Sequence, residues 1–188
     1  MMASNLTFRT ATAEDAPTLV DLINSSFRQD PTDEVFVSTD HTDFNMVDLG
    51  NLQSKISDPD CAVLIASNAH GSPIGHCYVR KLDINTAWMG LLAVDVQSQN
   101  GGVGRQMVAH AEDFARREWG SKRMTFNVVS TRSGLIAWYT RRGYRLTGET
   151  EPFPYQHIAN WKGLFRGDMH YVFMGKDLGP GSGRMQPA

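Results

Sequence analysis

The chain has 188 residues, of which 41% are apolar and 20% are charged, and this composition is that of a globular protein. The formal net charge of −2 gives no electrostatic reason to expect a nucleic acid or a membrane surface as partner. No apolar run approaches the roughly 20 residues of a membrane span. Two cysteines and six scattered histidines indicate neither a disulfide framework nor a metal site.

The first half of the chain begins with a short strand at residues 6–11. Residues 12–27 predict a helix, because Thr12 and Asp15 have the spacing of a capping box and apolar residues recur with helical period. A second helix is expected at residues 43–57, although Gly50 interrupts it. Three strands follow at residues 61–67, 73–83 and 87–96.

The first two of these strands are joined by "NAHGS", a sequence typical of a hairpin turn. If they pair about residue 69, Cys61 lies opposite Cys77. We expect both cysteines to be free thiols, because the start of the chain lacks the pattern of a secretory signal and a cytoplasmic location is the default.

The second half continues with a glycine-rich turn and a helix that Gly120 ends. A strand at 123–130, a short helix at 133–142 and strands at 144–148 and 168–178 follow, with an irregular connection before the last strand. This order predicts an α+β fold with a mixed, mainly antiparallel sheet of about seven strands and helices on both faces. We expect one domain over residues 1–178 and a disordered tail over residues 179–188.

The turn at residues 97–105 reads "QSQNGGVGR" and is suited to hold an anion. Glycines let a phosphate approach the backbone, while the N–H groups and dipole of the following helix favour a diphosphate. Gly104 is followed by Arg105 and Gln106, so this is not a Walker A loop, and neither the spacing nor the mid-chain position is that of a dinucleotide fingerprint. A glycine-rich turn without a ligand is the alternative.

Two segments in this region together resemble the GCN5-related N-acetyltransferase (GNAT) superfamily. Residues 91–115, "LLAVDVQSQNGGVGRQMVAHAEDFA", are similar to its acetyl-coenzyme A motif, and residues 135–144, "LIAWYTRRGY", are similar to its second motif. The resemblance implies an acyl-CoA N-acyltransferase fold. It also implies an enzyme that moves the acetyl group of acetyl-CoA to a primary amine by direct attack in a ternary complex.

The resemblance further implies that coenzyme A enters between the strand before the glycine loop and the strand after its helix. Ten residues would contact the pantetheine or the diphosphate: Leu92, Ala93, Val94, Gln99, Asn100, Gly101, Gly102, Val103, Gly104 and Arg105. Many family members carry an asparagine at the start of the short helix. Arg132 stands there in this chain, where it could bind a phosphate or lie in solvent.

Tyr139 lies where the family often has a tyrosine that protonates the leaving thiolate. Core packing is the alternative, because Tyr139 shares a helical face with Leu135 and Ile136. The glutamate that many members use as a base is missing, since this strand reads Trp88-Met89-Gly90. The substitutes at the acceptor side are polar residues that could equally have structural or solvated roles: Asn127, Glu149, Glu151 and His157.

The family's acceptor region corresponds to residues 28–45 and 148–167. Acidic residues in the first segment favour a cationic or amine-bearing acceptor: Asp30, Asp33, Glu34, Asp40 and Asp43. Aromatic residues in the second favour a small-molecule amine over a protein lysine or N-terminus: Phe153, Tyr155, Trp161 and Phe165. A non-catalytic acyl-CoA-binding sensor and a protein that binds another nucleotide are the competing functions. The oligomeric state is open, with a homodimer as one possibility.

Overall fold

The computed structural model describes residues 6–28, 35, 44–157 and 165–179. Within these residues the strands are β1 (Thr7–Thr10), β2 (Cys61–Ser67), β3 (Pro73–Lys81), β4 (Thr86–Val94), β5 (Arg123–Val129), β6 (Arg145–Pro152) and β7 (His170–Asp177). The α-helices are α1 (Ala16–Arg28), α2 (Leu49–Ser57), α3 (Val103–Trp119) and α4 (Ser133–Thr140), and short 3₁₀ turns lie at Ala13–Asp15, Val96–Ser98 and Tyr155–His157. Apart from Gly179, the expected disordered tail lies outside the described residues.

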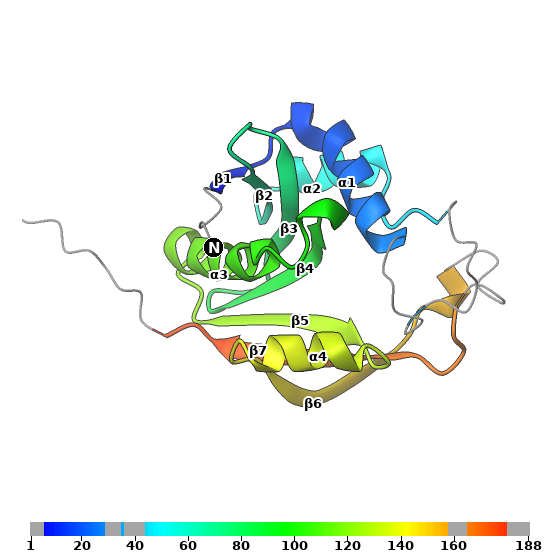
Figure 1. The fold of residues 1–188 in the computed structure, drawn as a ribbon. Coiled ribbons are helices and arrows are strands. Elements are labelled where there is room, and N and C mark those ends of the chain that lie inside the picture. The colour runs from blue at the N-terminus through cyan, green and yellow to red at the C-terminus, as the bar shows by residue number, and fades with distance from the viewer. Residues whose placement is uncertain (1–5, 29–34, 36–43, 158–164, 180–188) are drawn as a thin grey trace, which may run out of the picture.

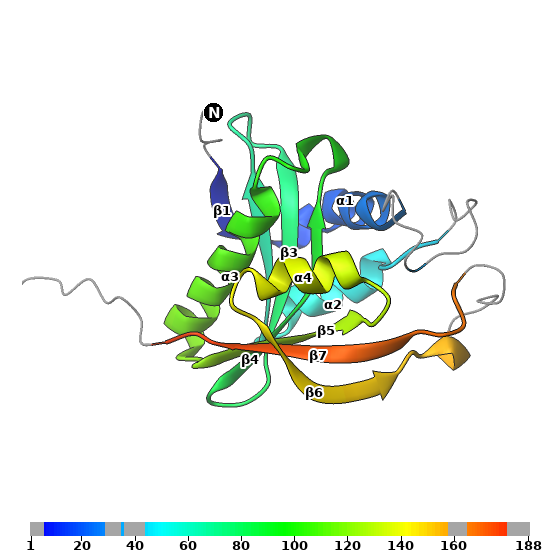
Figure 2. The ribbon, with the colours of Figure 1, turned by 60° about the horizontal axis from the view of Figure 1, so that its bottom comes forward.

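The seven described strands form one sheet in the order β1-β2-β3-β4-β5-β7-β6. Neighbouring strands are antiparallel except for β4 and β5, which run parallel. Helices α1 and α2 cover one face of the sheet, while α3 and α4 cover the other (Figures 1 and 2). The predicted α+β fold, with its mixed, mainly antiparallel sheet and helices on both faces, is confirmed.

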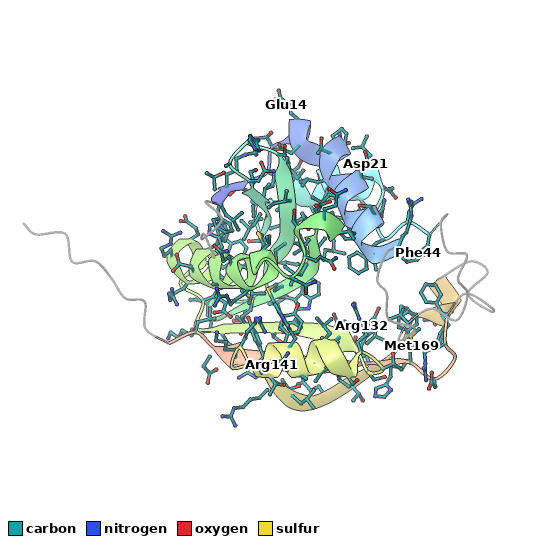
Figure 3. The ribbon with its side chains drawn as sticks, viewed as in Figure 1. Glu14, Asp21, Phe44, Arg132, Arg141 and Met169 are labelled. Atoms are coloured by element: carbon teal, nitrogen blue, oxygen red, sulfur yellow. The ribbon has the colours of Figure 1, made fainter. Side chains whose placement is uncertain are left out.

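Side chains fill the space between the sheet and each helical layer (Figure 3). On one face, the apolar stripe of α3, including Met107 and Ala111, packs on Leu64 and Val79 of the sheet. On the other face, Leu19 and Ile23 of α1 pack on Val63 and Ile65. Alternate residues of β2 and β3 therefore point to opposite cores, as the period of two of a strand requires.

The helix ends have clear local causes. The backbone N–H of Thr12 donates to the Asp15 carboxylate (2.7 Å), so the expected capping residues do begin the first helical segment. Helix α2 begins at Leu49 instead of residue 43, because the Asp48 carboxylate accepts a hydrogen bond from the Asn51 N–H (2.7 Å) and caps it there. Gly50 lies in the first turn of that helix, where it does not interrupt it.

The predicted pairing of Cys61 with Cys77 is wrong. Cys77 lies opposite Leu64, and Cys61 lies opposite Arg80. The turn is a compact loop in which the Asn68 side chain accepts hydrogen bonds from the N–H groups of His70 and Ser72, and this loop sets the pairing three positions away from the expected register. Both cysteines are free thiols, and the Cys61 thiol is in a hydrogen bond with the Tyr78 hydroxyl (2.9 Å).

The parallel pair β4–β5 separates after its first residues. Pairing covers only Thr86, Ala87 and Trp88 with Arg123, Met124 and Thr125. Beyond Trp88 the two strands diverge, and the β1–β4 half of the sheet opens away from the β5–β7 half (Figure 1). This opening lies between α3 and α4, and it positions the candidate site.

Candidate functional site

A bulge in β4 redirects the strand where the sheet opens. His76 pairs with Ala93 and Tyr78 pairs with Gly90, so β4 has one residue more than β3 over this interval. Leu91, at the bulge, has a left-handed backbone (φ 49°), an unusual conformation for a bulky side chain. The Leu91 carbonyl accepts a hydrogen bond from Nδ1–H of the fully buried His76 (2.8 Å). Burial lowers the pKa of His76 to about 4, so the ring is neutral near pH 7 and stabilises the bulge through this bond.

The glycine loop between β4 and α3 presents backbone N–H groups to the opening. Gly102, the residue before α3, has a left-handed backbone (φ 81°), as does Asn100 (φ 62°). The bond from Gln106 N–H to the Gly102 carbonyl (3.2 Å) opens the helix, so the N–H groups of Val103, Gly104 and Arg105 have no acceptor in a preceding turn. Three such donors at a helix N-terminus fit a diphosphate.

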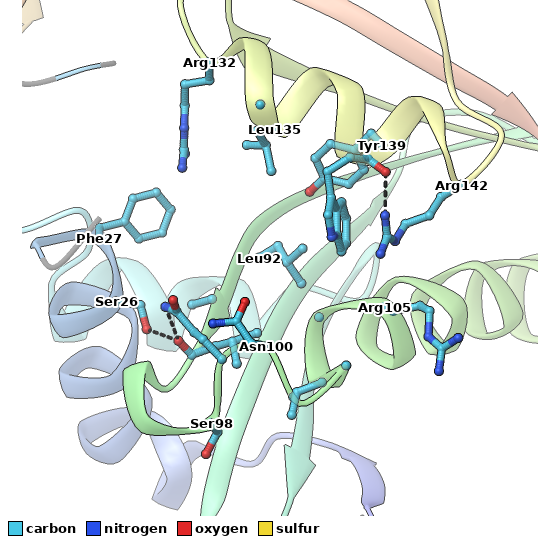
Figure 4. Close-up of a pocket in the computed structure, with 18 residues that line it drawn as sticks. Ser26, Phe27, Leu92, Ser98, Asn100, Arg105, Arg132, Leu135, Tyr139 and Arg142 are labelled. Atoms are coloured by element: carbon cyan, nitrogen blue, oxygen red, sulfur yellow. Dashed lines mark hydrogen bonds between the residues drawn. The ribbon is translucent and has the colours of Figure 1, made fainter. Parts of the chain in front are cut away.

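A cavity of about 620 Å³ runs from this loop through the opening to α4 (Figure 4). Its walls include ten of the eleven residues expected to bind the cofactor: Leu92, Ala93, Val94, Gln99, Asn100, Gly102, Val103, Gly104, Arg105 and Arg132. The exception is Gly101. The shape and the donor groups therefore suit a long ligand with a diphosphate and an extended chain.

The end of β4 is closely tied to its surroundings. The Val94 carbonyl accepts hydrogen bonds from the Ser26 hydroxyl (2.9 Å) and the Gln99 side-chain amide (3.3 Å), as Figure 4 shows. Gln99, expected to contact the diphosphate, thus also holds the loop against the strand. Ser26 joins α1 to the same carbonyl, and the loop is fixed from two sides.

Two arginines and a tryptophan, from the first turn of α3 and from the end of α4, also line the cavity. Arg142 lies over the ring of Trp138 (3.3 Å to the centroid) and donates to the Trp138 carbonyl. The pKa of Arg142 is lowered, first by burial and then by the positive charges of Arg141 and Arg105. Arg105 and Arg142 line the cavity together, and they give its entrance a positive field suited to phosphate groups.

Tyr139 lies at the inner end of the cofactor cavity. Its ring packs between Phe126 (4.3 Å between ring centroids) and Trp138 (4.8 Å), so it also belongs to the core. Burial raises the pKa of its phenol, which stays protonated and able to donate. Both interpretations of Tyr139, a proton donor and a core residue, are compatible with this place.

A second cavity, of about 560 Å³, meets the first one at this point. The two share five wall residues: Phe27, Leu92, Arg132, Leu135 and Tyr139. In Figure 4, Arg132 and Leu135 project from α4 toward Phe27 and Leu92. Arg132 thus lies where the cavities join and not beside the glycine loop, a place that suits contact with a thioester or an acceptor better than contact with a diphosphate.

The second cavity has a mainly apolar wall that is rich in aromatic residues. Phe44 and Arg132 lie on its two sides (Figure 3), and the other aromatic residues that line it include Trp88, Phe126, Phe153, Phe165 and Tyr171. Trp88, Met89 and Gly90, which replace the family's glutamate segment, are part of the wall. Among the described residues that line it, Arg132 is the only one with a formal charge.

Of the three expected acceptor-side residues whose side chains the structure describes, Asn127 lines this cavity, and Glu149 and Glu151 do not. Both glutamates are exposed on β6, which forms the edge of the sheet. Glu151 pairs with Tyr171, and its charge helps burial to raise the pKa of that tyrosine. His157 lies in the turn Tyr155–His157, and its side chain is outside the described part of the structure.

Several wall residues were not predicted from the sequence. Phe27 and Ser26 come from the end of α1, and Tyr171 comes from β7. Trp138 and Arg142 belong to the second motif, so their position beside Tyr139 was the available signal for them. The five acidic residues of the 28–45 segment and Trp161 lie outside the described residues.

No set of three His, Cys, Asp or Glu side chains in the described ranges is arranged to hold a metal ion. None of the helices found in those ranges is long and apolar enough to cross a bilayer.

Solved structures with the same fold include several acetyltransferases. Nourseothricin acetyltransferase is 22% identical, with a TM-score of 0.66 over 94% of this chain and 99% of that one. A putative acetyltransferase from Salmonella typhimurium with its cofactor acetyl-CoA is 20% identical (TM-score 0.66, 96% and 98% covered). A ribosomal-protein alanine N-acetyltransferase from Escherichia coli is 14% identical (TM-score 0.68, 97% and 99% covered). At these identities the likeness concerns the fold alone.

No curated protein sequence matches this chain. The family model described as the acetyltransferase (GNAT) family matches residues 18–144, which include the glycine loop, the open strand pair and most of the walls of the two joined cavities. The chain belongs to the acetyltransferase (GNAT) family.

Proposed function

We propose that this acetyltransferase moves the acetyl group of acetyl-CoA to the primary amine of a small molecule, by direct attack in a ternary complex. The observation that carries the proposal is the junction of the two cavities at Leu92, Arg132 and Tyr139. One cavity offers a glycine loop and arginines to a diphosphate, and the other offers an aromatic chamber to an acceptor. Only at this junction could the thioester of a cofactor in the first cavity reach the amine of an acceptor in the second cavity.

Acetyl-CoA supplies a thioester, and the residues of this chain would bind and orient it. The N–H groups of Val103, Gly104 and Arg105 would hold the diphosphate. The amine nitrogen would form a bond to the carbonyl carbon while the carbon–sulfur bond breaks. Tyr139 would donate its phenol proton, or a hydrogen bond, to the departing sulfur. The proton that the amine loses would then replace a proton given up by the Tyr139 phenol.

The family's base has no equivalent among the described residues that line the acceptor cavity. No carboxylate is among them, and Asn127, Tyr171 and Asn45 are the uncharged polar groups that accompany Tyr139 there. We infer that the amine enters in its neutral form or loses its proton to water. The rate should then rise with pH as the amine itself deprotonates.

The aromatic wall supports a small molecule as acceptor. Phe44, Phe153, Phe165 and Tyr171 would surround an apolar body, while a protein lysine on a folded surface would need a wider opening. Nourseothricin acetyltransferase, with the same fold, acts on a small molecule, and the ribosomal-protein enzyme shows that the fold also serves protein acceptors. We further propose that residues 1–178 act as one domain in the cytoplasm.

The test is an assay of thiol release from acetyl-CoA with a panel of primary amines, run beside calorimetry with acetyl-CoA. We expect micromolar to millimolar binding of acetyl-CoA and turnover of at least one small amine. A lysine-containing peptide serves as the comparison for the protein-acceptor alternative. Tight binding of acetyl-CoA without turnover of any amine or peptide would favour a non-catalytic acyl-CoA sensor.

A further inference from the structure

A third hollow, of about 440 Å³, adjoins the acceptor cavity. It lies between α2 and strands β3 and β4, on the face of the sheet that α1 and α2 cover. Met46, Trp88 and Leu91 line both hollows, so a ligand in the aromatic cavity could extend past Trp88 into the third one. Neither the glycine loop nor α4 contributes to its wall.

The charge of this hollow is positive. Lys55 from α2 and Arg80 from β3 are its charged wall residues, and no carboxylate is among the described residues that line it. Within the described ranges, neither cation has a carboxylate oxygen within ion-pair distance. Asp58 is a nearby carboxylate whose pKa is lowered, first by a hydrogen bond from the Asp60 N–H and least by the charge of Arg80, with which it forms no ion pair.

Tyr78 lines the same hollow as the two cations. The Lys55 ammonium lies 5.2 Å from the centre of the Tyr78 ring. Burial and the hydrogen bond with Cys61 raise the pKa of the Tyr78 phenol, on which the charges of Arg80 and Asp58 act in opposite directions. The Tyr78 hydroxyl is in a hydrogen bond with Cys61, and its ring contacts Trp88 edge to face (5.9 Å between centroids). A guanidinium, an ammonium and two aromatic rings therefore share one hollow. An anion bound in this hollow could accept charge-assisted hydrogen bonds from both cations.

We propose that the hollow formed by Lys55, Arg80, Tyr78 and Trp88 is an anion subsite of the acceptor site. The acceptor is then a primary amine with an apolar body that carries a carboxylate or phosphate at the end remote from the amino group. This inference rests on the proposed function. It differs from the expectation drawn from the acidic 28–45 segment, because the described walls offer positive charge and not negative charge to the acceptor.

The test compares pairs of amines that differ only in the remote anion. Phenethylamine is paired with 4-(2-aminoethyl)benzoate, and tyramine with tyramine phosphate, in the thiol-release assay. We expect the anionic member to have a kcat/KM at least about tenfold higher, mainly through KM, because the subsite lies away from the reacting atoms. The preference should fall as salt is added, since the hollow is open to solvent.

The decisive variant is the double substitution Lys55→Met and Arg80→Met, which should bring the ratio between the paired amines close to one. Lys122→Met is the matched control: this exposed lysine precedes β5 outside all three hollows, and its loss should leave the ratio unchanged. Amines that are acetylated without an anionic preference, or a preference that survives the double substitution, would overturn the subsite and leave the proposed function standing.

If no amine is acetylated, the proposed function fails and the subsite is tested by binding. Phenyl phosphate is titrated into the protein while the indole N–H signal of Trp88 is followed by NMR. A saturable shift that the double variant loses supports the anion subsite. A flat titration, or equal shifts in both proteins, rejects it.

Discussion

Gly102 has a backbone conformation that other residues adopt only with strain, and it lies directly before the N–H groups that would hold a diphosphate. We expect Gly102→Ala to cost about 1 kcal/mol of stability, as left-handed backbone does for residues with a Cβ. The strained loop should also bind acetyl-CoA about tenfold more weakly. Gly148→Ala is the matched control, because Gly148 has a similar φ (90°) with open space around it on the exposed strand β6.

Calorimetry and urea unfolding distinguish the two effects. Both variants should lose similar stability, and only Gly102→Ala should lose affinity; equal affinity in both would mean that the loop is not the diphosphate site. At Gly104, a Cβ would contact Trp138 and Val94 at an ordinary 3.6 Å. Gly104→Ala should therefore be tolerated, while the extra methyl groups of Gly104→Val would enter the cavity and weaken binding by an order of magnitude or more.

Tyr139→Phe removes one oxygen and keeps the ring that packs on Phe126. If the phenol assists the departing thiolate, kcat should fall by up to about 10²- to 10⁴-fold while the Kd for acetyl-CoA barely changes. Tyr144→Phe is the control, because this neighbouring ring is buried outside both cavities and its hydroxyl donates to Glu112 (2.9 Å). Full kcat in Tyr139→Phe over pH 6 to 9 would leave Tyr139 as a core residue only.

Elements far apart in the sequence are joined by a half-buried ion pair. The Lys176 ammonium of β7 contacts both carboxylate oxygens of Glu112 on α3 (2.9 and 2.7 Å), and Tyr144 donates to the same carboxylate. Glu112→Ala leaves Lys176 without its counter-charge and should lower the free energy of unfolding by about 2 kcal/mol. Asp177→Ala breaks the exposed pair with Arg123 (3.3 Å) and should change it by less than about 0.5 kcal/mol.

Chemical denaturation of the two variants measures this difference. A similar loss in both would mean that the contact between α3 and β7 is held by apolar packing alone, without a measurable contribution from Glu112.

The bulge in β4 depends on a histidine that must stay neutral. The pKa of His76 is about 4 in the folded protein and about 6.5 when unfolded, so the unfolded state binds more protons between these values. Stability from this residue is complete above pH 6.5 and is lost as the pH falls toward 4. At about 1.4 kcal/mol per pKa unit, the loss is roughly 3 kcal/mol.

His76→Gln offers a neutral donor to the Leu91 carbonyl and cannot be protonated. Urea unfolding at pH 7 and pH 4 should give a smaller decrease in stability for this variant than for the parent protein. Parallel decreases would assign the acid sensitivity to other groups.

The cofactor cavity joins the two diverging halves of the sheet, so ligand binding should stabilise the whole molecule. At 100 times its Kd, a ligand that binds only the folded state adds about 2.7 kcal/mol. For a chain of this size, that corresponds to a rise in Tm of roughly 5–10 °C. We expect this shift in differential scanning fluorimetry with acetyl-CoA and with CoA. ATP and NAD, at equal concentration, should produce little change, and an equal shift with either one would favour a different nucleotide as ligand.

Local pattern was enough to predict the order of the helices and strands, and it indicates a cofactor loop. Gly120 marks the end of α3 through its left-handed backbone, and residues 61–67 were placed as a strand with the observed bounds. The glycine run at residues 101–104 predicts a diphosphate site, because a close approach of backbone to ligand and the start of a helix are both encoded by neighbouring residues. These features depend on interactions within one turn or one strand, and such interactions are encoded by residues close together in the sequence.

The tertiary structure decided what depends on distant segments meeting. The position of the turn at residues 68–72 did not fix the register of the hairpin. The hydrogen bonds within the turn set that register, and Cys61 and Cys77 therefore do not lie opposite each other. Strand β6 continues to Pro152 as an exposed edge, and neither Glu149 nor Glu151 lines the acceptor cavity. Phe27 from α1, Trp88 from β4 and Tyr171 from β7 meet in one wall only after the sheet opens beyond Trp88. The sequence by itself determined the family and the position of the proposed cofactor loop. Packing between remote elements decided which residues line the proposed acceptor cavity, because no local period encodes which side chains converge on a cavity.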